Sequence, residues 1–233
     1  MKRVTLLVTR PADRADAFLD TLDPAVLARV ACLLSPLMAI VPTGQRPDLS
    51  RYAAVILTSA QAVALAPPGA GRIAHCVGAS TAQAARAAGW QVAALGQTAE
   101  ELLEKLPADA HAPLLHLAGA HRRGDLAERL TARGITTDVV TLYEQRLLEL
   151  APEAKVILSA GGPVIVPLFS PRTAAQFAAE IPPDAHPLCV AMSEAVAAAL
   201  GDLSGVEVVI AAAPTGQAMA QCVENMIVRA TLA

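Results

Sequence analysis

The chain has 233 residues, which is enough for one large domain or two of ordinary size, and either can fold without added staples. Its net charge is -3 and its Lys and Arg residues are scattered, which argues against a nucleic-acid partner, because such a partner requires a dense basic surface. Although 54% of the residues are hydrophobic, only 3% are aromatic, so we expect small side chains to pack closely, as in helices laid on a sheet.

The first half of the chain alternates short β-branched runs with alanine-rich stretches, a pattern typical of βα units around a parallel sheet. In chain order, we expect a strand at Val4–Thr9, a helix near Asp13–Leu22, and strands near Arg29–Leu34 and at Ala54–Thr58, His75–Val77 and Gln91–Leu95. Helices are expected after each of the last three strands.

The second half repeats this order, which predicts an internal duplication. We expect a strand at Leu114–Leu117, a helix at Asp125–Arg133 ended by Gly134, and strands at Thr137–Leu142 and near Val164–Phe169, Leu188–Ala191 and Val206–Ala211. Matching residues in the two halves are Leu6 and Leu114, Ser59 and Ser170, Cys76 and Cys189, and Thr98 and Thr215. The spacing between matching residues drifts slowly, as expected after a duplication with small insertions.

An extended segment follows the second strand of each half, at Pro36–Pro42 and at Tyr143–Leu148, just ahead of Pro152. Two such crossings are consistent with a chain that passes twice between two lobes, each lobe combining two strands of one half with three of the other. The pattern alone is equally compatible with an unswapped arrangement.

The four cysteines lie far apart, without C-x-x-C spacing, at Cys32, Cys76, Cys189 and Cys222. This usage predicts buried, reduced thiols in a cytoplasmic protein rather than a zinc site or a disulfide scaffold. The first apolar stretch stops at Thr9-Arg10-Pro11 and is too short for a signal peptide or a membrane span, so no membrane partner is expected.

Small polar residues stand at the predicted strand-to-helix junctions, the edge of an open parallel sheet where ligands bind. Several are explained as helix caps, because Ser80 with Gln83 and Thr98 with Glu101 have capping-box spacing and Ser170 precedes Pro171. Taken together, polar junctions facing one cleft between two lobes favour a ligand that carries many carboxylates.

Common catalytic signatures are missing from these junctions. The first strand is not followed by G-x-G-x-x-G, Gly119–Asp125 lacks the ending of a phosphate-binding loop, and no serine lies in G-x-S-x-G. The five histidines show no metal-ligand spacing; His116 is interpreted as a strand residue, and His121 as a residue that could reach the cleft. We therefore expect neither a nucleotide cofactor nor a metal.

In their order, the junctions resemble those of the uroporphyrinogen-III synthase family over nearly the whole chain. The matching residues are Val8-Thr9-Arg10-Pro11; Ile56-Leu57-Thr58-Ser59 with Ala62-Val63; Val77-Gly78-Ala79-Ser80-Thr81-Ala82; Gly119, Arg123, Leu126, Leu130 and Gly134; Leu142-Tyr143; Phe169-Ser170-Pro171; and Pro214-Thr215. One turn departs from the family's I-G-x-x-T-A, because the chain has Val190-Ala191-Met192-Ser193-Glu194-Ala195 there.

The resemblance implies a cyclising lyase of tetrapyrrole and heme biosynthesis that converts linear hydroxymethylbilane into uroporphyrinogen III, with loss of water, inversion of ring D and no cofactor. It implies a monomer of two flavodoxin-like lobes, each with a parallel five-strand sheet, in the swapped arrangement. The implied boundaries are 1–36 with 149–233 for the first lobe, 43–141 for the second, and 37–42 and 142–148 for a two-strand hinge.

Tyr143 matches the hinge tyrosine of that family and is the residue we expect to act in catalysis. A phenol is protonated at neutral pH and can donate a proton to the departing hydroxyl. The resemblance and the junctions together give the expected substrate-binding residues, with the arginines as carboxylate partners: Arg10, Thr58, Ser59, Ser80, Thr81, Arg123, Ser170, Arg172, Ser193 and Thr215.

Two other functions would suit an α/β chain. A two-lobed binding or sensor module could close on an anionic small molecule without chemistry. An NAD-dependent oxidoreductase would need a glycine-rich first turn, and Thr9-Arg10-Pro11 argues against it.

Overall fold

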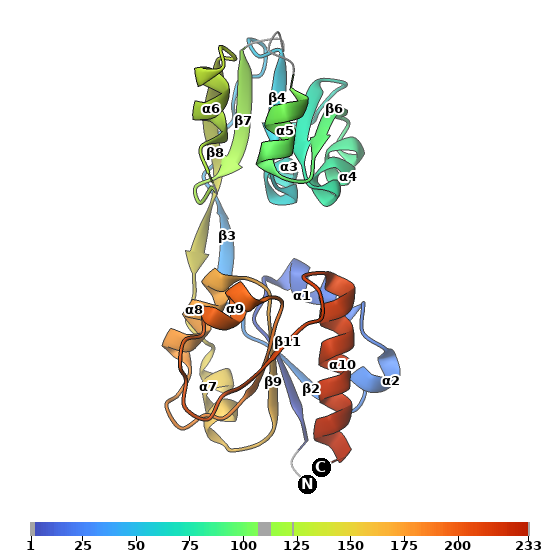
Figure 1. Ribbon diagram of the computed structural model, residues 1–233, viewed down its shortest axis with the longest axis vertical. Coiled ribbons are helices and arrows are strands. Elements are labelled where there is room, and N and C mark those ends of the chain that lie inside the picture. Colours follow the sequence, from blue (N-terminus) through green and yellow to red (C-terminus); the bar gives the residue numbers. More distant parts are fainter. Residues whose placement is uncertain (1–2, 107–112, 123, 233) are drawn as a thin grey trace. The chain divides into compact units, whose positions relative to one another are not determined.

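The computed structural model describes residues 3–106, 113–122 and 124–232. Contacts divide the chain into two compact units: unit 1 comprises Met1–Ala39 and Arg146–Ala233, and unit 2 comprises Ile40–Gln145. Each unit contains one sheet flanked by helices (Figure 1), which confirms the predicted α/β class with parallel sheets. The lobe and hinge boundaries expected from the sequence stay a prediction.

The sheet of unit 1 has the order β11-β10-β9-β1-β2, and all neighbouring strands run parallel. Its strands are β1 (Thr5–Val8), β2 (Ala31–Leu34), β9 (Val164–Leu168), β10 (Leu188–Ala191) and β11 (Glu207–Ile210). Its helices are α1 (Ala12–Leu19), α2 (Pro24–Leu27), α7 (Pro152–Ser159), α8 (Pro171–Glu180), α9 (Glu194–Ala198) and α10 (Gly216–Leu232).

Alternating strand residues of unit 1 build one core on each face of the sheet. Leu6 and Val8 pack in a cluster with residues of α1 and α10, whereas Leu7 packs in a second cluster with residues of α7, α8 and α9. Because helices cover both faces, the central strands are apolar throughout, as β9 shows with all five residues buried.

The sheet of unit 2 has the order β3-β8-β7-β4-β5-β6. Its strands are β3 (Met38–Pro42), β4 (Ala54–Leu57), β5 (Ile73–Val77), β6 (Gln91–Gly96), β7 (Leu114–Gly119) and β8 (Thr137–Leu147). Strands β4 to β8 pair in parallel, and the helices are α3 (Ala60–Leu65), α4 (Ala79–Ala87), α5 (Ala99–Lys105) and α6 (Leu126–Ala132). Leu57 packs with α3 and α4 on one face, and Ile56 packs with α5 and α6 on the other.

Both sheets combine strands from the two halves of the sequence. In unit 1, β1 from the first half lies beside β9 from the second; in unit 2, β7 from the second half lies beside β4 from the first. Unit 1 therefore joins two strands of the first half to three of the second, and unit 2 joins two strands of the second half to four of the first, which is the swapped arrangement. The sheet of unit 2 has six strands rather than the expected five, because β3 is added at its edge beside β8. Apart from β3, the strand order is the same in both sheets when β1 and β2 are matched to β7 and β8, although the duplication itself stays a prediction.

Strands β3 and β8 connect the units and pair with each other. The amide of Thr43 donates to the carbonyl of Leu142 at 2.9 Å, and the amide of Leu148 donates to the carbonyl of Leu37 at 2.9 Å. Residue numbers fall along one strand as they rise along the other, so the pairing is antiparallel. The sequence predicted a strand that ends at Leu142 and a separate extended segment, but this pairing makes Thr137–Leu147 one continuous strand.

Two helices were not predicted from the sequence, although each has a start signal. Helix α2 begins with Asp23, whose side chain accepts a hydrogen bond from the amide of Ala25, followed by Pro24. Helix α7 likewise begins with a proline, Pro152. Both helices lie close to segments that were interpreted as strands or linkers, so they were not recognised in the sequence.

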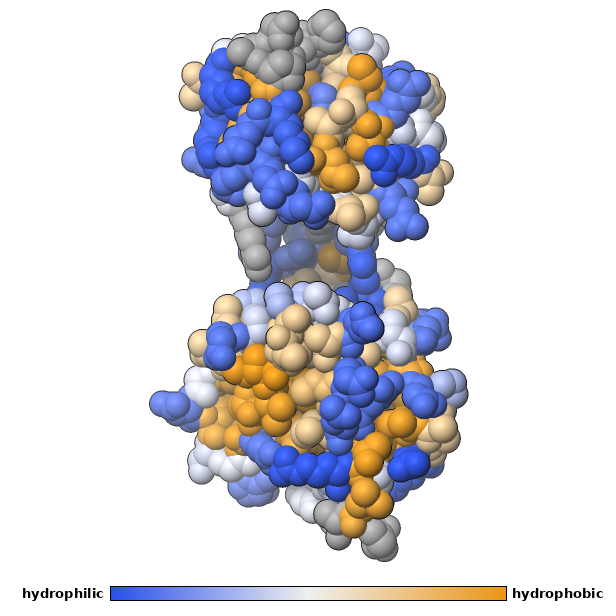
Figure 2. Space-filling model, turned by 45° about the vertical axis from the view of Figure 1, so that its right-hand side comes forward, coloured by the Kyte–Doolittle hydropathy of each residue, from blue (hydrophilic) through white to orange (hydrophobic). Residues whose placement is uncertain are grey.

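The face shown in Figure 2 mixes hydrophilic and apolar side chains on both units, as expected for a sequence so rich in hydrophobic residues. Within the described ranges, no helix is long and apolar enough to span a membrane. Cys32, Cys76, Cys189 and Cys222 are free thiols. Their expected burial is confirmed for Cys76 and Cys189, whereas Cys222 is only partly buried and the expectation is wrong for Cys32, which is exposed.

Candidate functional site

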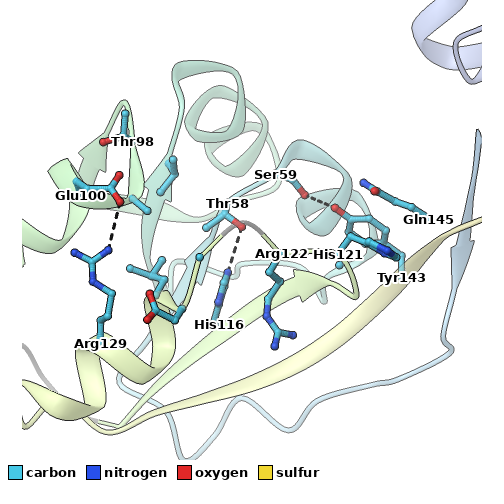
Figure 3. A pocket seen from close by; sticks show the side chains of 16 residues that line it. Thr58, Ser59, Thr98, Glu100, His116, His121, Arg122, Arg129, Tyr143 and Gln145 are labelled. Atoms are coloured by element: carbon cyan, nitrogen blue, oxygen red, sulfur yellow. Dashed lines mark hydrogen bonds and ion pairs between the residues drawn. The ribbon is translucent and has the colours of Figure 1, made fainter. Parts of the chain in front are cut away.

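A cavity of about 570 Å³ opens in unit 2, where β4, β5 and β7 end and α5 and α6 begin. Its wall includes many polar side chains, with charges of both signs (Figure 3): Thr58, Ser59, Thr98, Glu100, His116, His121, Arg122, Asp125, Arg129, Tyr143 and Gln145 contribute to it. This is the sheet edge at which ligands of open parallel sheets bind, and it contains three of the residues expected from the sequence, namely Thr58, Ser59 and Tyr143.

Tyr143 lies on β8 with its side chain directed into this cavity (Figure 3). Its backbone is fixed by the parallel ladder, in which its carbonyl accepts a hydrogen bond from the amide of Ala120 at 2.8 Å. Only 4% of the residue is exposed, and its hydroxyl lies 2.9 Å from the Oγ atom of Ser59. The phenol is therefore held by packing on one side and by a hydrogen bond on the other.

Gly119 provides the space that the Tyr143 ring occupies. A Cβ atom at position 119 would lie 2.6 Å from Cε2 and Cζ of Tyr143 and 2.9 Å from its hydroxyl oxygen. Carbon atoms in proteins do not approach so closely, so the ring can adopt this position only because residue 119 has no side chain. The glycine of the predicted G, R, L, L, G pattern thus contacts the predicted catalytic tyrosine.

Ser59 links the tyrosine to the start of α3. As the N-cap residue, it accepts a hydrogen bond from the amide of Ala62 through its Oγ atom at 3.1 Å. A serine hydroxyl has one proton and two lone pairs, so it can cap the helix and still hydrogen-bond to Tyr143. Its position is set by the backbone of the helix rather than by the ligand.

Thr58 and His116 form a second polar pair in the same wall. The Oγ1 atom of Thr58 lies 3.2 Å from Nε2 of His116, whose residue is 3% exposed within β7. Burial lowers the pKa of His116 to about 4, with a further contribution from the positive charge of Arg122 and an opposing one from Glu128. His116 is therefore a neutral imidazole at neutral pH.

This pKa shift makes the stability of the protein depend on pH. His116 has its ordinary pKa of 6.5 in the unfolded chain and a pKa of about 4 in the folded chain. Between these two pH values the unfolded chain binds more protons, so protonation favours unfolding. The contribution of neutral His116 to the free energy of unfolding is complete above pH 6.5 and is lost as the pH falls toward 4.

Urea titrations should show that wild type loses about 2 kcal/mol more of its free energy of unfolding between pH 7 and pH 4.5 than His116→Gln does. His75, whose pKa burial also lowers, is common to both proteins and cancels in this comparison. Equal losses in the two proteins would contradict the assignment of His116 as a neutral buried group.

The far wall of the cavity carries an ion pair between α5 and α6. Nη1 of Arg129 lies 3.3 Å from Oε1 of Glu100 (Figure 3), and both side chains are well exposed, so the pair contributes little to stability. Backbone hydrogen bonding and Arg129 lower the pKa of Glu100. Sequence reasoning missed both residues because they follow helix starts at spacings typical of solvated surface charges.

Arg123, expected to bind substrate, lies outside the described residues, whereas its neighbour Arg122 contributes to the cavity wall. Ser80 and Thr81 lie in α4 and are not among the residues that form the cavity. The capping role expected of Ser80 is wrong, because α4 already begins at Ala79 with Gly78, at φ +86, as its N-cap. Thr98 does cap α5, accepting from the amide of Glu101.

The other expected binding residues belong to unit 1. The guanidinium of Arg10 lies over the ring of Phe169, 4.0 Å from its centroid. Ser170 caps α8 by accepting from the amide of Thr173, and Thr215 accepts from the amide of Ala218. Arg172 lies in α8 and Ser193 precedes α9 without a capping hydrogen bond from its side chain. Their roles toward a substrate stay predictions.

Among the residues that the structure describes, no three His, Cys, Asp or Glu side chains converge as a metal site would require. His116 and His121 both contribute to the cavity, but the imidazole of His116 is already paired with Thr58. The chemistry that the wall itself offers is proton donation by a phenol and hydrogen bonding by hydroxyls.

The chain is similar to known proteins of one family, both in sequence and in structure. A model of the family described as uroporphyrinogen-III synthase HemD matches residues 29–221. The structure of uroporphyrinogen-III synthetase from Helicobacter pylori 26695 is similar with a TM-score of 0.68 at 19% identity, covering 97% of this chain and 100% of the other. A mutant uroporphyrinogen III synthase from the extremely thermophilic bacterium Thermus thermophilus is similar with a TM-score of 0.51 at 16% identity, covering 97% and 99%. No curated sequence matches the chain significantly.

Proposed function

Because the chain belongs to the uroporphyrinogen-III synthase family, a family of cyclising lyases, we propose that the cavity of unit 2 supplies the proton for that family's reaction. The substrate is hydroxymethylbilane, a linear tetrapyrrole with acetate and propionate side chains. The product is the cyclic uroporphyrinogen III, in which ring D is inverted. The observation that carries this assignment is the buried Tyr143 hydroxyl in the cavity, 2.9 Å from Ser59.

In the first step, the phenol of Tyr143 donates its proton to the terminal hydroxyl of the substrate, which leaves as water. The electrons of ring A form an electrophilic azafulvene, and the substituted carbon of ring D attacks it to give a spiro intermediate. Fragmentation and closure at the free carbon of ring D release one proton, which restores the phenol. The sum is the loss of one water, and no oxidant or reductant is consumed.

Ser59 supports this exchange through its contact with the phenol oxygen. When Tyr143 has given up its proton, the Ser59 hydroxyl can donate to the phenolate, and such charge-assisted hydrogen bonds are the stronger kind. The backbone amide of Ala62 already donates to the same serine oxygen, so Ser59 is oriented before the reaction begins. The serine thus stabilises the state in which the proton has left.

Positioning of the substrate determines which isomer forms, because closure without the enzyme gives the type I ring. The substrate carries negative carboxylates, for which Arg122 is a partner within the cavity wall. We extend the proposal to the other residues expected from the sequence, Arg10, Ser80, Thr81, Arg123, Ser170, Arg172, Ser193 and Thr215, as further contacts of the same ligand. Holding the reacting carbons close together accelerates one closure over the other.

The test is isomer analysis of the product. Purified protein mixed with freshly prepared hydroxymethylbilane is expected to give mainly the type III isomer by chromatography, with heat-inactivated protein as the control. Tight binding with only the type I product of the uncatalysed reaction would contradict the enzyme and favour a binding or sensor module.

Two further expectations belong to the proposal. The free thiols are consistent with a cytoplasmic protein, which fractionation of cells would test. The chain is proposed to act as a monomer without a nucleic-acid partner, and light scattering of the purified protein tests its mass.

A further inference from the structure

His116 contributes an almost fully buried imidazole to the cavity wall, with 3% of the residue exposed. It interrupts the apolar run of β7, where Leu114, Leu115 and Leu117 have no exposed surface. A buried polar group is costly unless it makes hydrogen bonds, and the ring is directed at Thr58 (Figure 3). The sequence predicted only a packed strand residue here, so this contact requires a separate explanation.

The explanation depends on which nitrogen carries the proton, because a neutral imidazole has one donor and one acceptor. If Nε2 accepted, the single proton of the Thr58 hydroxyl would be used on His116, and only lone pairs would face the cavity. If Nε2–H donates to Oγ1, the proton of Thr58 remains available. Carboxylates only accept hydrogen bonds, so an anionic ligand requires the second arrangement.

We propose that His116 is a positioning residue whose Nε2–H donates to Oγ1 of Thr58, so that the Thr58 hydroxyl presents its proton to a carboxylate of the substrate. This inference rests on the proposed function for the identity of the ligand. Arg122 supports it, because its charge is close enough to influence the pKa of His116 and would attract the same carboxylate. Thr58 and Tyr143 both contribute to the cavity wall, so this contact would hold the substrate in the cavity that contains Tyr143.

The first test reads the tautomer without turnover. NMR of the full chain labelled with ¹⁵N-histidine, at neutral pH, is expected to show a protonated Nε2 and an unprotonated Nδ1 for His116. The His116→Gln variant identifies the signal by its absence. A protonated Nδ1 with an unprotonated Nε2 would overturn the proposal.

The second test replaces His116 with two amide side chains of different length, Gln and Asn. The amide nitrogen of Gln is as many bonds from Cα as Nε2 of His, whereas that of Asn corresponds to Nδ1. We expect His116→Asn to lower kcat/KM for the type III isomer roughly tenfold and His116→Gln to lower it less than about threefold. Thermal unfolding must first show both variants folded at the assay temperature, and equal losses would overturn the proposal.

The third test asks whether His116 acts through Thr58. Thr58→Val removes the hydroxyl while keeping the shape of the side chain. The double variant with His116→Asn should be no slower than Thr58→Val alone, because both changes remove the same contact. If the two losses in kcat/KM multiply in the double variant, the proposal is overturned. If wild-type protein makes no type III isomer, the proposed function is refuted, and the tautomer measurement alone decides the His116–Thr58 contact.

Discussion

Tyr143→Phe is expected to lower kcat for the type III isomer by about 100-fold, the lower end of what a positioned proton donor contributes. The variant removes one oxygen atom and keeps the ring that packs against Gly119. Binding of the substrate should change little, so KM is expected to stay within about threefold of wild type. The measurement is steady-state kinetics with isomer analysis of the product.

Tyr52→Phe is the matched control, because Tyr52 is the other tyrosine of the chain. Its hydroxyl donates to Oδ2 of Asp138 at 2.7 Å, and the residue is not part of the cavity wall. This variant loses that hydrogen bond and the one that the hydroxyl accepts from Nη2 of Arg51 at 3.3 Å, both exposed, and should turn over like wild type. Equal rates for the two variants would remove Tyr143 from the mechanism.

Gly119→Ala is expected to lower kcat/KM by roughly 100-fold, because displacing a reacting group by about 1 Å is enough for a loss of that size. The new Cβ atom would lie 2.6 Å from the Tyr143 ring, so the ring must move and its hydroxyl must leave Ser59. Overpacking of this kind should also cost about 1–3 kcal/mol of the free energy of unfolding. Kinetics and urea unfolding of the same preparation measure both effects.

Gly69→Ala separates the loss of activity from the loss of stability. A Cβ atom there would lie 2.5 Å from the backbone nitrogen of Trp90 and 2.6 Å from the backbone carbon of Gly89, a more severe clash because backbone atoms cannot move aside, and it lies away from the cavity. Gly69→Ala should lose at least as much stability as Gly119→Ala, but only Gly119→Ala should lose activity at a temperature where both are folded. If Gly119→Ala keeps wild-type activity, the position of Tyr143 is not critical.

The fold could be predicted from the sequence because alternating strands and helices restrict an α/β chain to few arrangements. The apolar runs at Leu6 and Leu114 indicated strands in both halves, since strands covered on both faces carry continuous apolar residues. The extent of β8 could not be predicted, because its second part is held by hydrogen bonds to β3, which is distant in sequence. A local sequence pattern does not show which distant segment a strand will pair with.

The candidate site could be predicted where a residue's position follows from its own segment. Thr58 and Ser59 directly follow β4 and Ser59 caps α3, so their place at the sheet edge was evident. The role of His116 in the site could not be predicted, because it depends on Thr58. The two residues are remote in sequence and become neighbours only through the pairing of β4 and β7. Arg122 was missed because a loop sequence does not show that its side chain contributes to the cavity wall.

As a member of its family, this chain is expected to direct hydroxymethylbilane to the type III ring. The most direct measurement is the ratio of type III to type I product as the protein concentration is raised at fixed substrate. Enzymatic closure competes with uncatalysed closure, so we predict that the type III fraction rises from near zero and approaches the whole product. A product that remains type I at every protein concentration would contradict the claim.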